Sequence, residues 1–361
     1  MTGFAEHHDE LRAVARDLLG AADPTRGPEW ALMAESGWLG LEVPEAQGGA
    51  GATFAEVAVV LEELGRAASP GAFLGSVVLG VGALTLLEPT APRADLLAAL
   101  AAGDARVAVG LSSDGDTEAS VPFRVSAERR VEGSAPFVLD AHDADRLLLP
   151  ALDAADRVHL AVVDAGASGL TVTPQPVLDE ARNLGMVTCD DVDATEVLAF
   201  AADDGHASHR RLRERAAVAV ALDSLGLSEA MLAATVAYAS TRHQFGRAIG
   251  SFQAVKHACA DLAVEAAIAR ELVGAAVAQV AAGERDDGGV AAAMAASYAT
   301  EAGLRAAGTA LQLHGGIGYT WESGIHRYLK RAALNRSLFG SPAGHRRLLS
   351  ARRAAAAQPA R

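Results

Sequence analysis

Residues 242–257 read Arg-His-Gln-Phe-Gly-Arg-Ala-Ile-Gly-Ser-Phe-Gln-Ala-Val-Lys-His. They separate two Ala-rich segments with helical patterns, residues 210–241 and 251–283, so we expect the corner of an antiparallel helical hairpin. Helix ends leave backbone groups unpaired, and a guanidinium can bind a phosphate through two parallel hydrogen bonds. Arg242 and Arg247 therefore make this corner a candidate pyrophosphate site. Spacing alone is explained at least as well by glycines that turn the chain while both arginines face water.

A second motif closes a later helical pattern and reads Gln312-Leu313-His314-Gly315-Gly316-Ile317-Gly318-Tyr319. In order and spacing, the two motifs together resemble those of the acyl-CoA dehydrogenase family. The resemblance implies an FAD cofactor, which these segments hold for the neighbouring subunit. It implies that Arg242 binds the pyrophosphate, and that the following residues lie at the flavin nucleotide: Gln244, Phe245, Phe252, Gln253, Gln312, Gly315 and Gly316.

Composition excludes several other classes of protein. Half of the 361 residues are hydrophobic, and the net charge of −14 argues against nucleic acid and against anionic membrane surfaces as main partners. Only Cys189 and Cys259 occur, so no disulfide framework is expected, and a reducing cytoplasm is the simplest location. The N-terminus lacks the pattern of a signal peptide. Histidine pairs such as His206 and His209 lack the spacing of a metal site, so no metal is expected.

Residues 67–87 contain no charged side chain, and this uncharged segment is long enough to span a bilayer. Ser69-Pro70 opens the segment like a helix cap, and several glycines lower its hydrophobicity. We therefore expect a buried helix here, with a membrane span as the alternative. The small residues from Gly71 to Gly82 could also make room for a bulky or polycyclic acyl chain.

The chain divides into three regions by pattern. Residues 1–103 are expected to form an N-terminal helical domain, residues 104–203 a β domain, and residues 204–361 a C-terminal four-helix bundle. The middle region contains short apolar runs separated by Gly, Asp and Pro, as in a β-barrel or sandwich. The abundance of Ala in the last region suits closely packed helices. This order matches the three-domain layout of the acyl-CoA dehydrogenase family over essentially the whole chain.

Desaturation of an acyl-CoA needs a base for the α-proton and an acceptor for the β-hydride, which in this family is the flavin. The family's base is a glutamate in a Tyr-Glu-Gly-Thr stretch, and Gly340 stands at that position here. A second family position, early in the first bundle helix, corresponds to Ala216. Glu214 lies two residues away, which turns its side chain by about 200° around the helix. Glu214 is a candidate base, although a solvated first-turn carboxylate is the more ordinary explanation.

The β region also departs from the family pattern. The family's Thr-Glu-Pro-x-Ala-Gly-Ser stretch, which meets flavin and substrate, corresponds to residues 111–116 here. The family's Trp-Ile-Thr or Phe-Val-Ser stretch corresponds to Phe137-Val138-Leu139. Phe137 could cover the flavin ring, while Leu139 has no hydroxyl to offer. As a bare sequence feature, Phe137 is also typical of a core residue.

Residues offered to a neighbour's flavin are thus kept, whereas several that a subunit uses for its own flavin are changed. This asymmetry suggests the base-lacking subunit of a heterotetramer that desaturates an acyl-CoA, with an electron-transfer flavoprotein as acceptor. A homomeric dehydrogenase with a displaced base is one alternative. A flavin-free scaffold subunit that keeps the fold for assembly is another.

Overall fold

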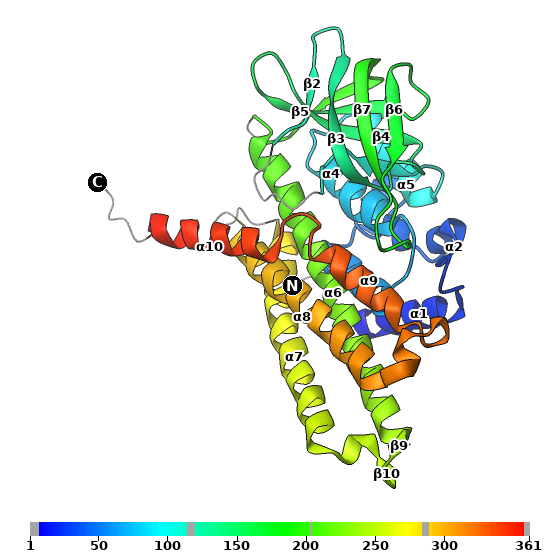
Figure 1. Ribbon diagram of the computed structural model, residues 1–361. Helices are drawn as coiled ribbons and strands as arrows, with labels where there is room; N and C mark the ends of the chain where they lie inside the picture. The colour runs from blue at the N-terminus through cyan, green and yellow to red at the C-terminus, as the bar shows by residue number, and fades with distance from the viewer. Residues whose placement is uncertain (1–6, 114–119, 203, 284–288, 357–361) are drawn as a thin grey trace.

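The computed structural model describes residues 7–113, 120–202, 204–283 and 289–356. Helices, then strands, then helices follow one another along the chain, so the predicted order of regions is confirmed. In Figure 1 the β domain lies at one end of the molecule, and the helical bundle extends away from it to the short hairpin β9–β10.

The N-terminal region consists of helices, of which α1 and η4 contact α3. The elements are α1 (His8–Ala21), α2 (Trp30–Glu35), η2 (Trp38–Gly40), η3 (Glu45–Gln47), α3 (Phe54–Arg66), η4 (Phe73–Val81), α4 (Gly82–Thr85) and α5 (Ala91–Ala102). A capping box starts α3, because the Thr53 hydroxyl accepts from Ala55 N (3.2 Å) and Glu56 accepts from Thr53 N (2.8 Å). These bonds satisfy backbone donors that a helix start leaves free.

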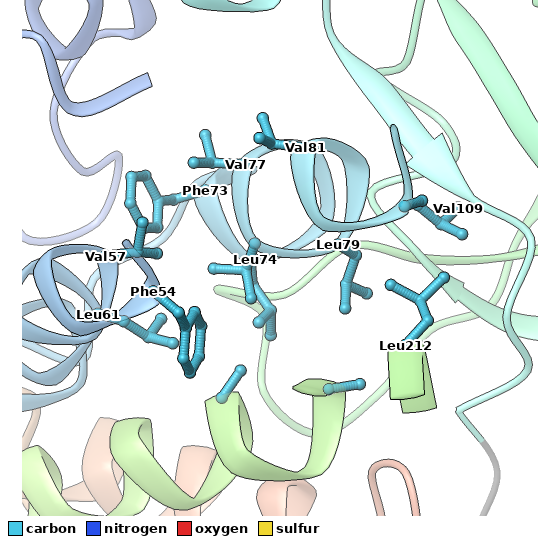
Figure 2. Packing of buried hydrophobic residues seen from close by; sticks show 14 of the residues in the cluster. Phe54, Val57, Leu61, Phe73, Leu74, Val77, Leu79, Val81, Val109 and Leu212 are labelled. Atoms are coloured by element: carbon cyan, nitrogen blue, oxygen red, sulfur yellow. The ribbon is translucent and has the colours of Figure 1, made fainter. Parts of the chain in front are cut away.

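The uncharged segment is a buried helix, as expected, and its first part, η4, is π-helical. Figure 2 shows Phe73, Leu74, Val77 and Leu79 among side chains of α3, β1 and α6. Within η4, Gly75 and Gly80 allow close packing and do not make room for a ligand. A Cβ on Gly75 would lie 2.4 Å from Asp140, and one on Gly80 would lie 2.3 Å from Val107.

The β domain is a single eight-stranded sheet. Its strands are β1 (Val107–Val109), β2 (Phe123–Val125), β3 (Arg130–Leu139), β4 (Arg146–Leu152), β5 (Val158–Asp164), β6 (Leu170–Pro174), β7 (Leu184–Asp193) and β8 (Glu196–Ala199). The order is β6-β7-β3-β2-β4-β5-β8, with β1 parallel to β4. The sequence patterns missed β7 and β8. The polar run Asp190–Asp193 at the end of β7 hides its alternation, yet seven of its residues pair with β3.

The C-terminal region is the helical bundle. It contains α6 (His206–Thr241), β9 (His243–Gln244), β10 (Arg247–Ala248), η5 (Ile249–Ser251), α7 (Gln253–Ala282), α8 (Val290–His314), η6 (Gly315–Tyr319), η7 (Trp321–Ser323), α9 (Ile325–Asn335) and α10 (Pro342–Ala356). Of the described helices, only α6 is long and apolar enough to cross a membrane, and 78% of its most apolar window is buried inside the protein. It therefore forms the central core helix.

Glycines let α3 and α6 cross at close range. A Cβ on Gly226 would lie 2.0 Å from the Glu62 carbonyl oxygen, and a Cβ on Gly65 would lie 2.3 Å from the Asp223 carbonyl oxygen. Any side chain larger than hydrogen at these positions would force the two helix backbones apart. The N-terminal region and the bundle are therefore joined backbone against backbone.

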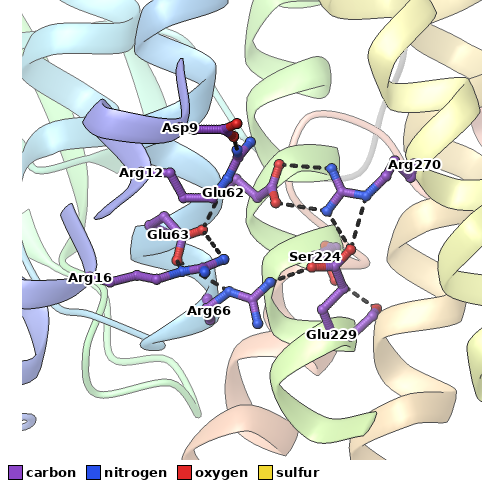
Figure 3. A network of polar contacts seen from close by, with 10 residues as sticks. Asp9, Arg12, Arg16, Glu62, Glu63, Arg66, Ser224, Glu229 and Arg270 are labelled. Atoms are coloured by element: carbon purple, nitrogen blue, oxygen red, sulfur yellow. Dashed lines mark hydrogen bonds and ion pairs between the residues drawn. The ribbon is translucent and has the colours of Figure 1, made fainter. Parts of the chain in front are cut away.

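Ion pairs reinforce this junction (Figure 3). Arg12 of α1, Arg16 of α1 and Arg66 of α3 surround the buried Glu63 carboxylate, with N–O distances of 3.5, 2.9 and 3.2 Å. Arg270 of α7 binds both Glu62 and Glu229, which lie on α3 and α6. Four helices thus share one polar network, and the carboxylates that α3 buries are all compensated.

Candidate active site

The corner between α6 and α7 is a β-hairpin that projects from the bundle. Gln244 pairs with Arg247, and His243 pairs with Ala248. The two turn residues, Phe245 and Gly246, both have positive φ (53° and 79°), as the tight two-residue hairpin turn requires. A phenylalanine in this left-handed conformation is strained. Phe245 is 91% exposed, so this strained turn places an aromatic ring in solvent.

Cations and rings are arranged around this hairpin. The Arg247 guanidinium carbon lies 4.0 Å from the centre of the Phe252 ring, and Phe245 meets the same ring edge-on at 6.2 Å. Ile249 N donates to the Arg242 carbonyl oxygen (2.8 Å), which closes the hairpin. Across the described residues, neither Arg242 nor Arg247 forms an ion pair with a carboxylate. Two guanidinium groups are therefore open to an anion.

The second motif lies against the same end of α6. His314, the last residue of α8, stacks on Tyr238 of α6 with ring centres 4.4 Å apart. Gly315 then turns the chain with φ 61°, and Gln312, Gly315 and Gly316 are exposed. No atom lies within 4 Å of the place where a Cβ on Gly315 or Gly316 would stand. A ligand could therefore approach this backbone closely.

We call residues 242–253 and 312–321 the bundle tip. Large apolar side chains gather there: Phe245 is 91% exposed, Trp321 77%, Tyr319 71% and Ile317 45%. Such a set of exposed aromatic side chains marks an interaction surface. The open arginines could bind a nucleotide pyrophosphate, and the exposed rings could pack against its base. The accessible glycines leave room for the ligand beside the backbone. The residues of the tip therefore fit the outer part of an FAD.

The candidate ring-covering residue lies far along the chain from the tip, in the β domain. Phe137 occupies a bulge in β3, where the pairing with β7 shifts register between Ala135 and Val138. Its φ is 53°, its N–H donates to Gln175 Oε1 (2.6 Å), and its ring is half-buried against the core. A bulge re-aims a side chain. Leu139 is only 1% exposed, so it offers nothing to a flavin.

The segment around Gly340 is held by hydrogen bonds to neighbouring loops, and none of these bonds involves a carboxylate. Phe339 N donates to the Ser113 carbonyl oxygen (3.1 Å), and the Ser113 hydroxyl donates to the Phe137 carbonyl oxygen. The His345 ring hydrogen-bonds to the backbone of Gly340, and its Nε2 has no partner within the described residues. Leu111, Leu212, Leu338 and Phe339 belong to the same buried apolar cluster and are all at most 4% exposed. The residues 114–116 that continue the expected flavin-binding stretch lie outside the described residues.

Two histidines near this segment are neutral. Burial, together with the positive charge of Arg213, lowers the pKa of His209 and of His345 to about 4. Arg213 itself donates to the Ser112 carbonyl oxygen (3.1 Å). A neutral imidazole with so low a pKa is a weak base, so neither ring replaces the family's glutamate in strength.

Glu214 turns to another side of α6. One residue beyond Arg213, it is rotated by about 100° from the face that meets residues 112–113. A Cβ on Gly289 would lie 2.8 Å from Glu214 Oε1, so the carboxylate lies against the N-terminus of α8. A carboxylate there is stabilised by the helix dipole.

A cleft of about 1340 Å³ contains none of these residues. It separates α1 and α2 from the loops at residues 140–143 and 180–183. The predicted site residues therefore lie in separate places: at the bundle tip, in the Phe137–Gly340 region and, for Glu214, at the N-terminus of α8.

Comparison with known proteins agrees with this architecture. The profile of the acyl-CoA dehydrogenase N-terminal domain matches residues 3–104, and that of the C-terminal domain matches residues 206–354. The acyl-CoA dehydrogenase IpdE2 of Mycolicibacterium smegmatis is 34% identical over 344 residues, which cover 95% of this chain and 92% of that protein.

Solved structures extend the similarity. The Tcur3481–Tcur3483 steroid ACAD is 29% identical, with a TM-score of 0.87 over 98% of this chain and 99% of that one. The ChsE4–ChsE5 complex from Mycobacterium tuberculosis is 26% identical, with a TM-score of 0.87 over 99% of both chains. This chain belongs to the acyl-CoA dehydrogenase family.

Proposed function

We propose that this chain is the base-lacking subunit of a hetero-oligomeric, FAD-dependent acyl-CoA dehydrogenase. Its bundle tip would complete a flavin site with a related subunit that carries the catalytic glutamate. When bound, the flavin supplies the hydride acceptor for α,β-desaturation of an acyl-CoA thioester. The contribution of this chain would be to bind and orient the nucleotide through Arg242, Gln244, Phe245, Phe252, Gln253, Gln312, Gly315 and Gly316.

The contrast between two regions carries the proposal. At the tip, Arg242 and Arg247 have no carboxylate partner among the described residues, and the rings of Phe245, Tyr319 and Trp321 are exposed. At Gly340, the side chain that would accept the α-proton is missing, and Leu212 and Phe339 are buried in the apolar core. A subunit of this kind supports half of a shared site. The Tcur3481–Tcur3483 and ChsE4–ChsE5 names each join two proteins, which is the arrangement proposed here.

The substrate would be an acyl-CoA bound mainly by the partner. One similar structure is named a steroid ACAD, so thioesters of bulky, polycyclic acyl groups belong in the first set of substrates to test. An electron-transfer flavoprotein would reoxidise the flavin.

Co-purification tests the assembly. Alone, the chain is expected to be colourless, whereas co-expressed with a related, glutamate-bearing subunit it should absorb near about 450 nm and reduce an artificial acceptor with acyl-CoA. A homomeric enzyme would instead be yellow and active alone, and its activity would be lost in Glu214→Gln. A scaffold would stay colourless with the partner too.

Replacement of one guanidinium tests the tip. Arg242→Ala in the co-purified complex should weaken FAD binding by about 10-fold or more, because a charge-assisted hydrogen bond to phosphate contributes about 1.5–3 kcal/mol. Arg124→Ala, which removes an exposed arginine from the β domain, is the matched control and should leave flavin content unchanged. Equal flavin retention in both variants would remove Arg242 from the pyrophosphate role.

A further inference from the structure

A second cavity, of about 190 Å³, lies where the N-terminal region meets the bundle. Its lining residues come from α4, α6, α7 and α8 and the segments beside them: Glu42, Gly82, Thr85, Leu86, Arg211, Glu214, Arg215, Ala276, Gln279, Val280, Gly283 and Ala292. Arg242, the C-cap of α6, follows Arg211 by 31 positions, a distance of about 45 Å along the helix. The cavity is therefore separate from the bundle tip.

Two of the charges in the lining cancel each other. The Arg215 guanidinium donates to Glu42 Oε1 (3.0 Å) and to Glu42 Oε2, and its Nε donates to the Val78 carbonyl oxygen (2.7 Å). The same group stacks over the Phe54 ring at 4.3 Å. All faces of Arg215 are thus engaged, and Gly82 provides the space it needs, since a Cβ there would lie 2.5 Å from Nε.

Glu214, another residue of the lining, lies at one end of the helix α8. Its Oε1 lies at Gly289, where the N-terminus of α8 begins. The positive end of that helix dipole stabilises the carboxylate.

Arg211 is the remaining charge, and it is half-buried. Its guanidinium forms no hydrogen bond or ion pair with any residue in the described ranges. Gln279 adds an amide, and the Thr85 hydroxyl donates to the Gly82 carbonyl oxygen (3.0 Å). The rest of the lining is apolar and includes Leu86, Ala276, Val280 and Ala292. One open cation beside an apolar wall suits an anion with a short hydrocarbon tail.

We propose that this cavity binds a short-chain carboxylate, with its headgroup on Arg211 and its alkyl tail against α7 and α8. The volume equals that of about six water molecules, which limits the ligand to a few carbon atoms. A bidentate Arg–carboxylate bond provides the specificity, and burial of the alkyl tail contributes about 0.8 kcal/mol per CH₂.

Thermal unfolding of the full chain with added butyrate tests the site, because a ligand that binds only the folded state raises Tm. Butyrate at up to about 50 mM should raise Tm in a saturable manner, whereas butyramide, the neutral analogue, should not. Phosphate, an anion without an alkyl tail, tests whether the site binds any anion. If phosphate raised Tm as much as butyrate does, the apolar wall would have no role.

Two variants act by different means, so misfolding of one leaves the other informative. Arg211→Gln removes the cation, and Ala276→Leu fills the cavity from α7; each should weaken butyrate binding by about 10-fold or more. Arg210→Gln changes the adjacent, exposed arginine and should bind butyrate as the unmodified chain does. Absence of any butyrate shift in the unmodified chain, or an unchanged shift in Arg211→Gln, would overturn the proposal.

Discussion

At the scale of single residues, three buried titratable groups control how stability depends on pH. His209 and His345 have a pKa of about 4 in the folded chain, against about 6.5 unfolded, so the unfolded state takes up their protons first. Burial raises the pKa of Asp140 to about 6, so this carboxyl is protonated first in the folded state. Between pH 6.5 and pH 5 each histidine lowers the free energy of unfolding by about 1.4 kcal/mol per pH unit, and Asp140 offsets one of them below pH 6.

His345→Gln should therefore flatten the pH dependence. With one histidine removed, His209 and Asp140 nearly cancel below pH 6. Urea unfolding at pH 7, 6 and 5 measures the slope. His7→Gln, at an exposed histidine, is the control. It should leave the slope of the free energy of unfolding against pH as steep as in the unmodified chain. An equal slope in His345→Gln and in the unmodified chain would show that His345 is accessible to protons in the folded state.

At the scale of helices, the crossing of α3 and α6 depends on hydrogen at two positions. Gly226→Ala places a methyl group 2.0 Å from the Glu62 carbonyl oxygen, so the helices must separate. We expect a loss of about 1–3 kcal/mol or more in the free energy of unfolding, as in overpacked cores. Gly274→Ala on α7 is the matched control, because nothing lies within 4 Å of its Cβ position. It should gain about 0.5–1 kcal/mol from helix propensity. Similar effects of both changes would contradict this account of the crossing.

At the scale of the whole molecule, one buried carboxylate connects the three regions. Asp223 of α6 accepts from Arg182 of the β domain (2.9 Å), from Arg331 of α9 (3.1 Å) and from Asn335 of α9 (2.7 Å). Arg331, which is fully buried, also binds Asp179 and the Ser69 carbonyl oxygen. The positive charges of these arginines keep the pKa of Asp223 below its usual value despite burial.

Asp223→Ala should cost about 3–5 kcal/mol, because it leaves two buried guanidinium groups short of a counter-charge. Chemical unfolding would measure the loss, and limited proteolysis would reveal separation of the β domain from the bundle. Asp153→Ala, at a carboxylate whose partners among the described residues all lie in its own β-hairpin, should destabilise the chain far less. Comparable losses would show that the junction does not depend on Asp223.

The sequence by itself determined the order of helical and β regions, the bundle helices and the motifs of the bundle tip. These features are local, because helical periodicity and a two-residue turn depend on residues a few positions apart. The same is true of the absence of a glutamate at Gly340. Only the tertiary structure decided how β7 and β8 join the sheet, how Arg331 and Asp179 meet, and which way Glu214 points. Such contacts join residues far apart in sequence, and they depend on how whole elements pack. The glycines of η4 show the difference: in sequence they suggested space for a ligand, yet packing brings Asp140 and Val107 against them.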